Sequence, residues 1–409
     1  MKKSFLLVGA NFINKGAQAM LFTAVTELRK RFVDCDIYMS SIFDYMEDNS
    51  QYRFSIIPGG NLSYKCCDNI VVYTYVKNKG RLKEFLGKNN LEKKYAQLRD
   101  ILPSLTAVLD ISGYALSSQW GYDNSMKYIQ TLKWAEKNGI PVFLLPQSFG
   151  PFDYGDNQYT ADKEIKKSLA GVECIFAREK NGKELLEKKY GLKNVVLSAD
   201  MVLQCKKLTL NEIFQSIPED IGVRISTHKN VAVIPNVRNL EHGNKEIVMK
   251  MYDAAVRTLL KLDRNVYLVA HSKEDGAICE KLKKDYSNNG RVFLVEEDLN
   301  CIQYESFVSF MDYIIGSRFH SIVHAYKEDI PCVAIGWAVK YKELLERFGQ
   351  IQYAVDVRSN NAENALLEAI NRMEINYTHE KAKIAESLKI IQDQNCFDVI
   401  EKILLGGSK

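Results

Sequence analysis

Short apolar runs alternate with longer amphipathic segments along almost the whole chain. In the first half these runs are rich in β-branched and aromatic residues, and we predict strands at 4–10, 36–41, 69–76, 105–112, 141–146, 173–178 and 194–200. Segments of helical period, such as 16–32 and 123–139, separate most of them. Because strands that are apolar on both faces belong in covered parallel sheets, this order predicts βαβ units with right-handed crossovers.

The pattern resumes after a weakly periodic stretch, residues 204–230, in which polar residues, proline and glycine accumulate. Beyond it, strands are predicted at 231–236, 265–271, 291–297, 312–317 and 331–337. A chain of 409 residues is also too long for one ordinary core. We therefore predict an α/β fold with two Rossmann-like parallel-sheet domains that face each other across a cleft. They are residues 1–205 and 206–375, and we expect the helical segment 376–409 to pack back on the first domain.

Composition is typical of a soluble globular protein, with 46% hydrophobic and 26% charged residues. The net charge of +4 is too small for a nucleic-acid binder of this length. Nine scattered cysteines, several inside apolar runs, indicate reduced thiols and a cytoplasmic protein. The apolar run near the N-terminus is too short for a signal peptide, and no run has the length of a membrane span.

The strand predicted at 312–317 leads directly into the most suggestive polar residues of the chain. Ser317, Arg318 and His320 follow it at the start of a predicted helix. Ligands of open α/β sheets bind beyond the carboxyl ends of strands, and a helix N-terminus favours an anion there. Arg318 brings a planar fork suited to carboxylate or phosphate, and His320 titrates near neutral pH. The pattern predicts an anion site.

Arg238 and Lys340 follow two other predicted strands and add cations to the same edge. Together with Arg318 they fit a small, multiply charged anion. The alternative is that Arg318 pairs with a local carboxylate while His320 only caps the helix. His320 and His324 also have zinc-ligand spacing, but no third ligand is evident, so we expect His324 to pack behind the helix and predict no metal site.

The chain resembles the polysaccharide pyruvyl transferase family in several of these motifs. The resemblance rests on GSRFHSIVHAYKEDIPCVAIGW at 316–337 and NFINKGAQAML at 11–21, and it covers roughly residues 5–350. It implies two Rossmann-like domains arranged as in GT-B glycosyltransferases. It also implies transfer of the pyruvyl group of phosphoenolpyruvate onto two hydroxyls of one sugar, which forms a cyclic ketal and releases phosphate. Phosphoenolpyruvate is then the donor substrate, and no cofactor is required.

This resemblance assigns the strand-end residues to a donor side and an acceptor side. For the donor we expect Arg238, Ser317, Arg318, Lys340 and His271. For catalysis we expect His320 and Arg318, with Asp110 as the base on the acceptor side unless it is a buried structural aspartate. For the acceptor we expect Asn14, Gly16, Ser112, Gly113, Gln147 and Ser148, which lie in the loops after first-domain strands.

The expected acceptor is a sugar of a lipid-linked oligosaccharide at the inner face of the membrane, in capsular, exopolysaccharide or cell-wall polymer synthesis. The basic segment 77–94 is either a solvated helix face or a peripheral contact with anionic lipid. One alternative function is a GT-B glycosyltransferase that uses a nucleotide sugar. Another is an inactive glycan-binding relative, which Ala17 favours because family members tend to have aspartate there.

Overall fold

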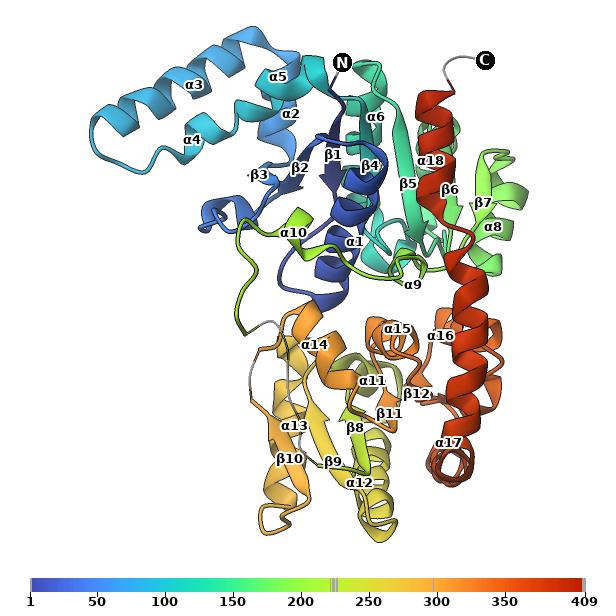
Figure 1. The fold of residues 1–409 in the computed structure, drawn as a ribbon. Coiled ribbons are helices and arrows are strands. Elements are labelled where there is room, and N and C mark those ends of the chain that lie inside the picture. The colour runs from blue at the N-terminus through green and yellow to red at the C-terminus, as the bar shows by residue number, and fades with distance from the viewer. Residues whose placement is uncertain (1, 221, 223–224, 226, 297, 407–409) are drawn as a thin grey trace.

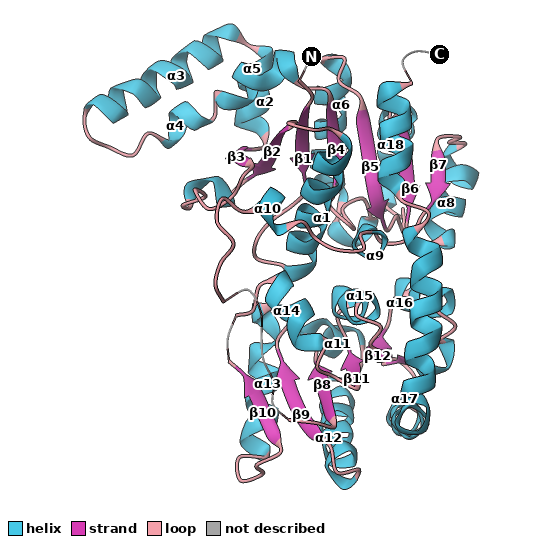
Figure 2. Cartoon of the chain, in the orientation of Figure 1, coloured by secondary structure: helices cyan, strands magenta, loops and turns pink. Residues whose placement is uncertain are grey.

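Two parallel sheets form the centres of two α/β domains (Figures 1 and 2). The computed structural model describes residues 2–406 except 221, 223, 224, 226 and 297. The first sheet has the order β3-β2-β1-β4-β5-β6-β7. Its strands are β1 Ser4–Val8, β2 Asp36–Ser41, β3 Ser55–Pro58, β4 Ala107–Asp110, β5 Val142–Gln147, β6 Cys174–Ala177 and β7 Val195–Leu197.

Helices cover both faces of the first sheet. They are α1 Lys15–Arg31, α2 Asn61–Asp68, α3 Ile70–Phe85, α4 Leu91–Lys94, α5 Gln97–Ile101, α6 Tyr122–Lys137, α7 Gln158–Ala170, α8 Lys180–Tyr190, α9 Met201–Gln204 and α10 Leu210–Ile213. The central strand β1 is apolar from Phe5 to Val8 because both of its faces are buried. Phe5 and Leu7 pack in one core cluster, and Leu6 and Val8 pack in another on the opposite face.

The second sheet has the order β10-β9-β8-β11-β12-β13, and all of its pairings are parallel. Its strands are β8 Asn230–Ile234, β9 Asn265–Val269, β10 Val292–Val295, β11 Tyr313–Gly316, β12 Cys332–Gly336 and β13 Ala354–Asp356. Its helices are α11 Val237–His242, α12 Lys245–Lys261, α13 Gly276–Asp285, α14 Cys301–Val308, α15 Phe319–Lys327 and α16 Val339–Arg347. The prediction of two parallel-sheet α/β domains is confirmed.

The prediction of a strand at 69–76 is wrong, because these residues begin α3. Asn69 caps this helix by accepting hydrogen bonds from the backbone N–H groups of Val71 and Val72. Val76 and Gly80 form the buried side of α3, and Gly80 lies directly against Lys93 of α4. The cap and this helix packing outweigh the strand preference of the β-branched residues. The sequence reading also missed the short strands β3 and β13.

Two helices at the C-terminal end return the chain from the second domain to the first (Figure 1). They are α17 Ala362–Gln392 and α18 Cys396–Leu405. At the start of α18, the backbone N–H of Cys396 donates to the Gln204 side chain, and Arg31 of α1 pairs with Asp398 of α18. Of the predicted linker 204–230, residues 221, 223, 224 and 226 lie outside the described residues. Among described residues, no helix has the length and apolar character needed to cross a membrane.

Candidate functional site between the two sheets

The start of α15 is fixed by a buried serine, Ser317, which precedes Arg318 at the N-cap position. The Tyr252 hydroxyl donates to the Ser317 hydroxyl at 2.9 Å, and the Asn236 side-chain amide donates to the Ser317 carbonyl at 2.9 Å. Ser317 is fully buried and does not line the pockets described below. Its contacts hold the helix start against α12 and the end of β8, so Arg318 is presented at the sheet edge.

The Arg318 guanidinium is held by carboxylates of the neighbouring loop. Nε lies 2.9 Å from Oδ2 of Asp275, and Nη2 lies 2.6 Å from Oδ1 of the same residue. Nη2 also donates to Glu274 at 2.5 Å. The pairing with a local carboxylate, weighed above as the alternative, is therefore present. It leaves Nη1 without a hydrogen-bond partner among the described residues, so one side of the fork remains available to a ligand.

Glu274 links Arg318 to the second predicted arginine. The Arg238 guanidinium is half-exposed, lies 2.9 Å from Glu241 and lies 3.6 Å from Glu274. Two arginines thus share a network with three carboxylates instead of forming a bare cationic patch. An incoming anion has to compete with Glu241 and Glu274, whose exposed side chains are free to turn toward water.

His320 lies at the contact between the two domains. Its Nε2 is 3.5 Å from Oδ2 of Asp200, and Arg178 Nη1 is 2.8 Å from that oxygen. Burial lowers the pKa of His320, while the Asp200 carboxylate acts in the opposite direction. A Cβ atom on Gly16 would lie 2.3 Å from Nδ1 of His320, so only glycine lets α1 approach the imidazole. First-domain residues therefore set the position of a second-domain histidine.

A pocket of about 620 Å³ lies at this contact and brings together five of the predicted residues. These five are Asn14, Arg238, His271, Arg318 and His320; the rest of the lining is Gln119, Trp120, Asn236, Glu241, His242, Ser272, Glu274, Phe319, Trp337 and Tyr341.

His271 is buried, its ring lies 4.9 Å from that of Tyr304, and its Nε2 has no partner among the described residues. Burial lowers the pKa of His271 well below its usual value, so its imidazole is neutral.

Lys340 occupies a neighbouring hollow of about 330 Å³ and does not line the arginine pocket. Nζ of Lys340 lies 5.5 Å from the centre of the Phe319 ring, which lines the arginine pocket, and 4.9 Å from the centre of the Tyr114 ring. Burial lowers the pKa of Lys340 to about 8. Ser148 lines this hollow too, with its hydroxyl bonded to Glu179 and Arg178.

A larger pocket of about 870 Å³ lies along the edge of the first sheet. Apart from Lys127, Asp44, Glu274 and Arg318, its lining is uncharged: Val8, Gly9, Ala10, Asn11, Ile13, Asn14, Ser40, Ser41, Ile42, Phe43, Gly59, Gly60, Asn61, Tyr64, Tyr128, Gln130, Thr131 and Ser272. Asn14 and Arg318 belong to this pocket and to the arginine pocket. The two spaces therefore meet where the domains meet.

Several predicted acceptor residues lie behind this pocket. Asp110 is buried, accepts from the backbone N–H of Ser112 at 2.7 Å and bonds to the hydroxyl of Tyr128. Gln147 lies 3.4 Å from the same hydroxyl, and Gly113 lies against Met20. Burial raises the pKa of Asp110. These contacts favour a structural role for Asp110, Ser112, Gly113 and Gln147, and the side chains of Asp110 and Gln147 position Tyr128 at the pocket wall.

His324 lies one turn behind His320 and is fully buried. Its Nδ1 is 3.2 Å from Glu305, which also pairs with Lys327 at 2.8 Å. Within the described part of the chain, no group of three or more His, Cys, Asp or Glu side chains is arranged to hold a metal ion.

The sequence reading missed the partners that orient these groups. Asp275 and Ser272 form a capping box at the loop after β9, a spacing that is visible in the printed sequence. Asp200 lies shortly after the end of β7 and also caps α9. Both aspartates follow strands, so the rule that located Arg318 could have located them as well.

The family model described as polysaccharide pyruvyl transferase matches residues 14–338. This range begins at Asn14 and includes Arg238, His271, Arg318 and His320. A search of curated proteins found no match.

Solved structures with similar folds include sugar-nucleotide enzymes. A putative UDP-N-acetylglucosamine 2-epimerase from Listeria monocytogenes has a TM-score of 0.56 at 10% identity, covering 100% of this chain and 98% of that chain. The Neisseria meningitidis UDP-GlcNAc 2-epimerase has a TM-score of 0.55 at 12% identity, covering 99% and 100%. A Medicago truncatula protein complexed with UDP-glucose has a TM-score of 0.54 at 9% identity, covering 98% of each chain.

At these identities the likeness shows the fold alone, which is the GT-B arrangement of two parallel-sheet α/β domains. The family match has a wider meaning, because it covers well over half of the chain and reaches both sheet edges. The chain therefore belongs to the polysaccharide pyruvyl transferase family.

Proposed function

We propose that this protein transfers the pyruvyl group of phosphoenolpyruvate onto two hydroxyls of a sugar, forming a cyclic ketal and releasing phosphate. The observation that carries the proposal is the pocket in which Arg238, Arg318, His271 and His320 meet Asn14 of the other domain. It has the size of a small ligand and opens to a second, largely uncharged pocket. A small dianion and a polyhydroxyl acceptor are the two kinds of substrate that such a pair accommodates.

The donor half of the proposal assigns the free side of Arg318 to a carboxylate or phosphate oxygen. Asp275 holds the other side through two hydrogen bonds, so the guanidinium needs no reorganisation when a ligand arrives. Arg238 and Glu274 are more exposed, and Arg238 is free to turn from Glu274 to the second anionic group of the ligand. The negative charges of a bound dianion then take the place of Glu241 and Glu274, which pair with Arg238 in the free protein.

The chemical step adds a hydroxyl across the carbon–carbon double bond of the donor. In the free protein burial favours the neutral imidazole of His320, which takes the proton of the attacking hydroxyl. The hydroxyl oxygen bonds to C2, and the imidazolium delivers the proton to the methylene carbon. The second hydroxyl then attacks C2, the C2–O–phosphate bond breaks, and the released phosphate accepts the remaining proton.

We further propose that the acceptor is a lipid-linked oligosaccharide of a capsular, exopolysaccharide or cell-wall pathway and that the reaction takes place in the cytoplasm. The first-domain pocket supports a sugar acceptor because its wall carries amides, hydroxyls and the Tyr64 and Tyr128 rings. Such groups recognise sugars through hydrogen bonds and ring stacking. Lys340 has a pKa of about 8 and lines the neighbouring hollow. We propose that its positive charge stabilises the phosphate after the phosphate has been released.

The discriminating experiment measures thermal unfolding with phosphoenolpyruvate and with UDP-N-acetylglucosamine, followed by phosphate release with a panel of lipid-linked sugars. At about 100 times its Kd, phosphoenolpyruvate should stabilise the protein by about 2.7 kcal/mol. The structural neighbours that carry UDP-sugars make a nucleotide-sugar glycosyltransferase the second candidate. Stabilisation by the nucleotide sugar, with none from phosphoenolpyruvate, would favour that candidate.

A further inference from the structure

A helical arm, defined here as residues 70–94 with α3 and α4, projects from the first domain (Figure 1). Its two helices pack against each other at Gly80, where a Cβ atom would lie 2.4 Å from the backbone nitrogen of Lys93. Val76 is buried on the same side of α3. The opposite side of α3 has no helix or strand of the described chain over it, as the exposure of its side chains shows.

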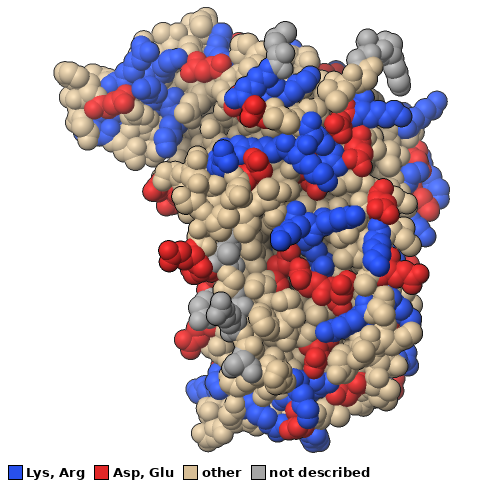
Figure 3. Space-filling model, viewed as in Figure 1, with Lys and Arg blue, Asp and Glu red and all other residues tan. Residues whose placement is uncertain are grey.

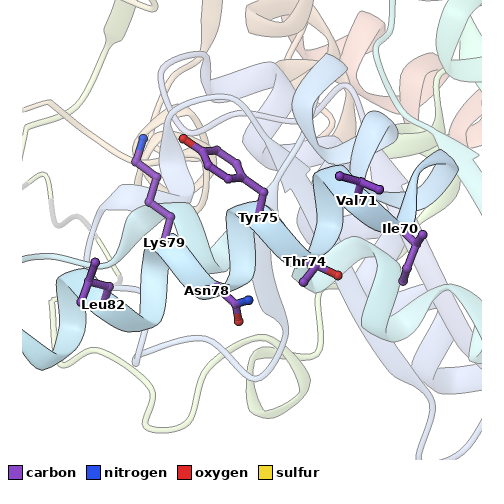
Figure 4. A pocket seen from close by; sticks show the side chains of 7 residues that line it. All are labelled: Ile70, Val71, Thr74, Tyr75, Asn78, Lys79 and Leu82. Atoms are coloured by element: carbon purple, nitrogen blue, oxygen red, sulfur yellow. The ribbon is translucent and has the colours of Figure 1, made fainter.

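That uncovered side is apolar. Val71 is 72% exposed, Tyr75 63%, Leu82 59%, Phe85 86% and Leu86 57%. Most of these residues recur at spacings of three, four or seven, so they share one face of α3 and its C-terminal tip. A pocket of about 730 Å³ is lined by α3 alone along this face (Figure 4). Thr74, Asn78 and Lys79 interrupt the apolar residues of this lining, but a mainly apolar exposed surface of this kind marks an interaction site.

The arm also carries the net positive charge of the protein. It contains seven Lys and Arg residues and two Glu, a net charge of +5, whereas the whole chain has +4. Figure 3 shows these basic side chains gathered on the arm. The glutamates are paired within it, Glu92 with Lys83 and Glu84 with Lys93. Arg81 and Lys88 are exposed and have no ion-pair partner among the described residues.

We propose that the arm docks on an anionic lipid bilayer. Phe85 and Leu86 at the tip enter the acyl boundary, and Arg81, Lys88 and the neighbouring lysines contact the phosphates of the headgroups. An amphipathic helix with aromatic and leucine residues on one face and lysines around it binds such surfaces through buried apolar area plus electrostatic attraction. A second copy of the chain fits less well, because two arms of charge +5 repel each other.

The base of the arm adjoins the first-domain pocket. Asn61 and Tyr64 of α2, which leads into α3, line that pocket. A docked arm therefore holds this pocket near the lipid surface. The consequence for catalysis, that a lipid-linked acceptor is presented to the pocket at the membrane, rests on the proposed function; membrane docking itself does not.

The test is co-sedimentation of the full chain with vesicles of phosphatidylcholine alone and of phosphatidylcholine mixed equally with phosphatidylglycerol. We expect binding to the anionic vesicles only. It should weaken between about 0.1 M and about 1 M salt, where the Debye length falls from about 10 Å to about 3 Å. The variants Phe85→Ser/Leu86→Ser and Arg81→Glu/Lys88→Glu should each lower the partition coefficient at least about tenfold.

Matched controls lie on the second domain. Ile375 is 83% exposed on α17, so Ile375→Ser removes an exposed apolar side chain of similar exposure. Arg372→Glu/Lys284→Glu reverses two exposed charges there. Both controls should bind vesicles like the wild type. Thermal unfolding checks that all variants fold, since every substituted side chain is exposed.

Three outcomes overturn the proposal. They are equal binding to both kinds of vesicle, wild-type binding by the two arm variants, and a concentration-dependent dimer in sedimentation velocity that Phe85→Ser/Leu86→Ser abolishes. The last would make a second copy the occupant. Phosphate release on a water-soluble acceptor is read separately: its absence contradicts the proposed reaction and leaves the vesicle result standing.

Discussion

The two sheet edges that face each other in this protein differ sharply in charge. The second-domain edge carries Arg238 and Arg318 tied to Glu274 and Asp275, whereas the lining of the first-domain pocket is mostly uncharged and consists of glycines, apolar side chains, amides, hydroxyls and two tyrosines. Under the proposed function, each edge binds a different substrate, the second-domain edge a compact anion and the first-domain edge an uncharged sugar. The contrast then means that the donor binds where the two arginines lie and the acceptor binds in a pocket with few charges, although Arg178, Glu179 and Asp200 of the first domain bring charge to the domain contact as well.

His320 should be the most sensitive point of the charged edge. We expect His320→Asn to lower turnover by about 10²- to 10⁴-fold, because the group that moves the proton is lost. His324→Asn is the matched control one turn away: it should cost about 1–3 kcal/mol of stability because His324 is buried beside Glu305, with turnover largely kept. Phosphate release and thermal unfolding measure both variants. Wild-type turnover in His320→Asn would transfer the proton step to another group.

Arg318→Lys should reduce phosphate release by at least about 10²-fold. Lysine keeps the charge but loses the paired hydrogen bonds to Asp275 that position the group, and a displacement of about 1 Å has costs of this size. Arg264→Lys is the control, since Arg264 makes a similar forked contact with Glu374 away from the pocket. It should lower the melting temperature without lowering turnover. Full activity of Arg318→Lys would mean that only the point charge matters.

Gly16→Ala tests whether the first-domain edge sets the position of His320 on the second-domain edge. The added methyl would clash with the His320 ring, so we expect turnover to fall by roughly tenfold or more while the substitution stays outside the charged network. Gly290→Ala is the control, because a Cβ atom there meets nothing within 4 Å. Steady-state kinetics decide the point, and unchanged turnover in Gly16→Ala would show that the ring can shift without loss.

Asp200→Asn should change the pH dependence more than the maximal rate. The carboxylate raises the pKa of His320, so its removal lowers that pKa and moves the acidic limb of kcat/KM to lower pH. Glu179→Gln is the control: it also removes a carboxylate from Arg178, but Glu179 does not contact His320. An unmoved acidic limb in Asp200→Asn would exclude Asp200 as the residue that tunes this histidine.

The sequence predicted the strands well where they are long and apolar on both faces. β1, β5, β8 and β11 are buried throughout, and their β-branched residues have no other place to pack. It failed at α3, where Ile70, Val71 and Val72 have strand preference but follow a capping asparagine and extend into solvent as part of the arm. Strand preference has little effect there, because no strand of the described chain lies beside these residues to pair with them.

The sequence predicted which side chains line the candidate site, but it did not predict the residues that hold them in place. The strand-end rule located Arg238, Arg318, His271 and His320, which line one pocket. The rule did not predict that Lys340 packs near Phe319 and lines a different hollow, since the direction of a side chain at a helix start depends on packing. The pairing of His320 with Asp200 depends on how the two domains sit together, which no local pattern encodes.

The most direct test of the central claim is calorimetric titration of phosphoenolpyruvate, without any sugar, into the wild type, Arg318→Lys and Thr131→Val. Thr131 lines the first-domain pocket and accepts a hydrogen bond from Tyr64, so its valine variant alters the neutral edge alone. We predict binding to the wild type, at least about tenfold weaker binding to Arg318→Lys, and unchanged binding to Thr131→Val. Failure of the wild type to bind, or weakening by Thr131→Val alone, would contradict the assignment of the donor to the charged edge.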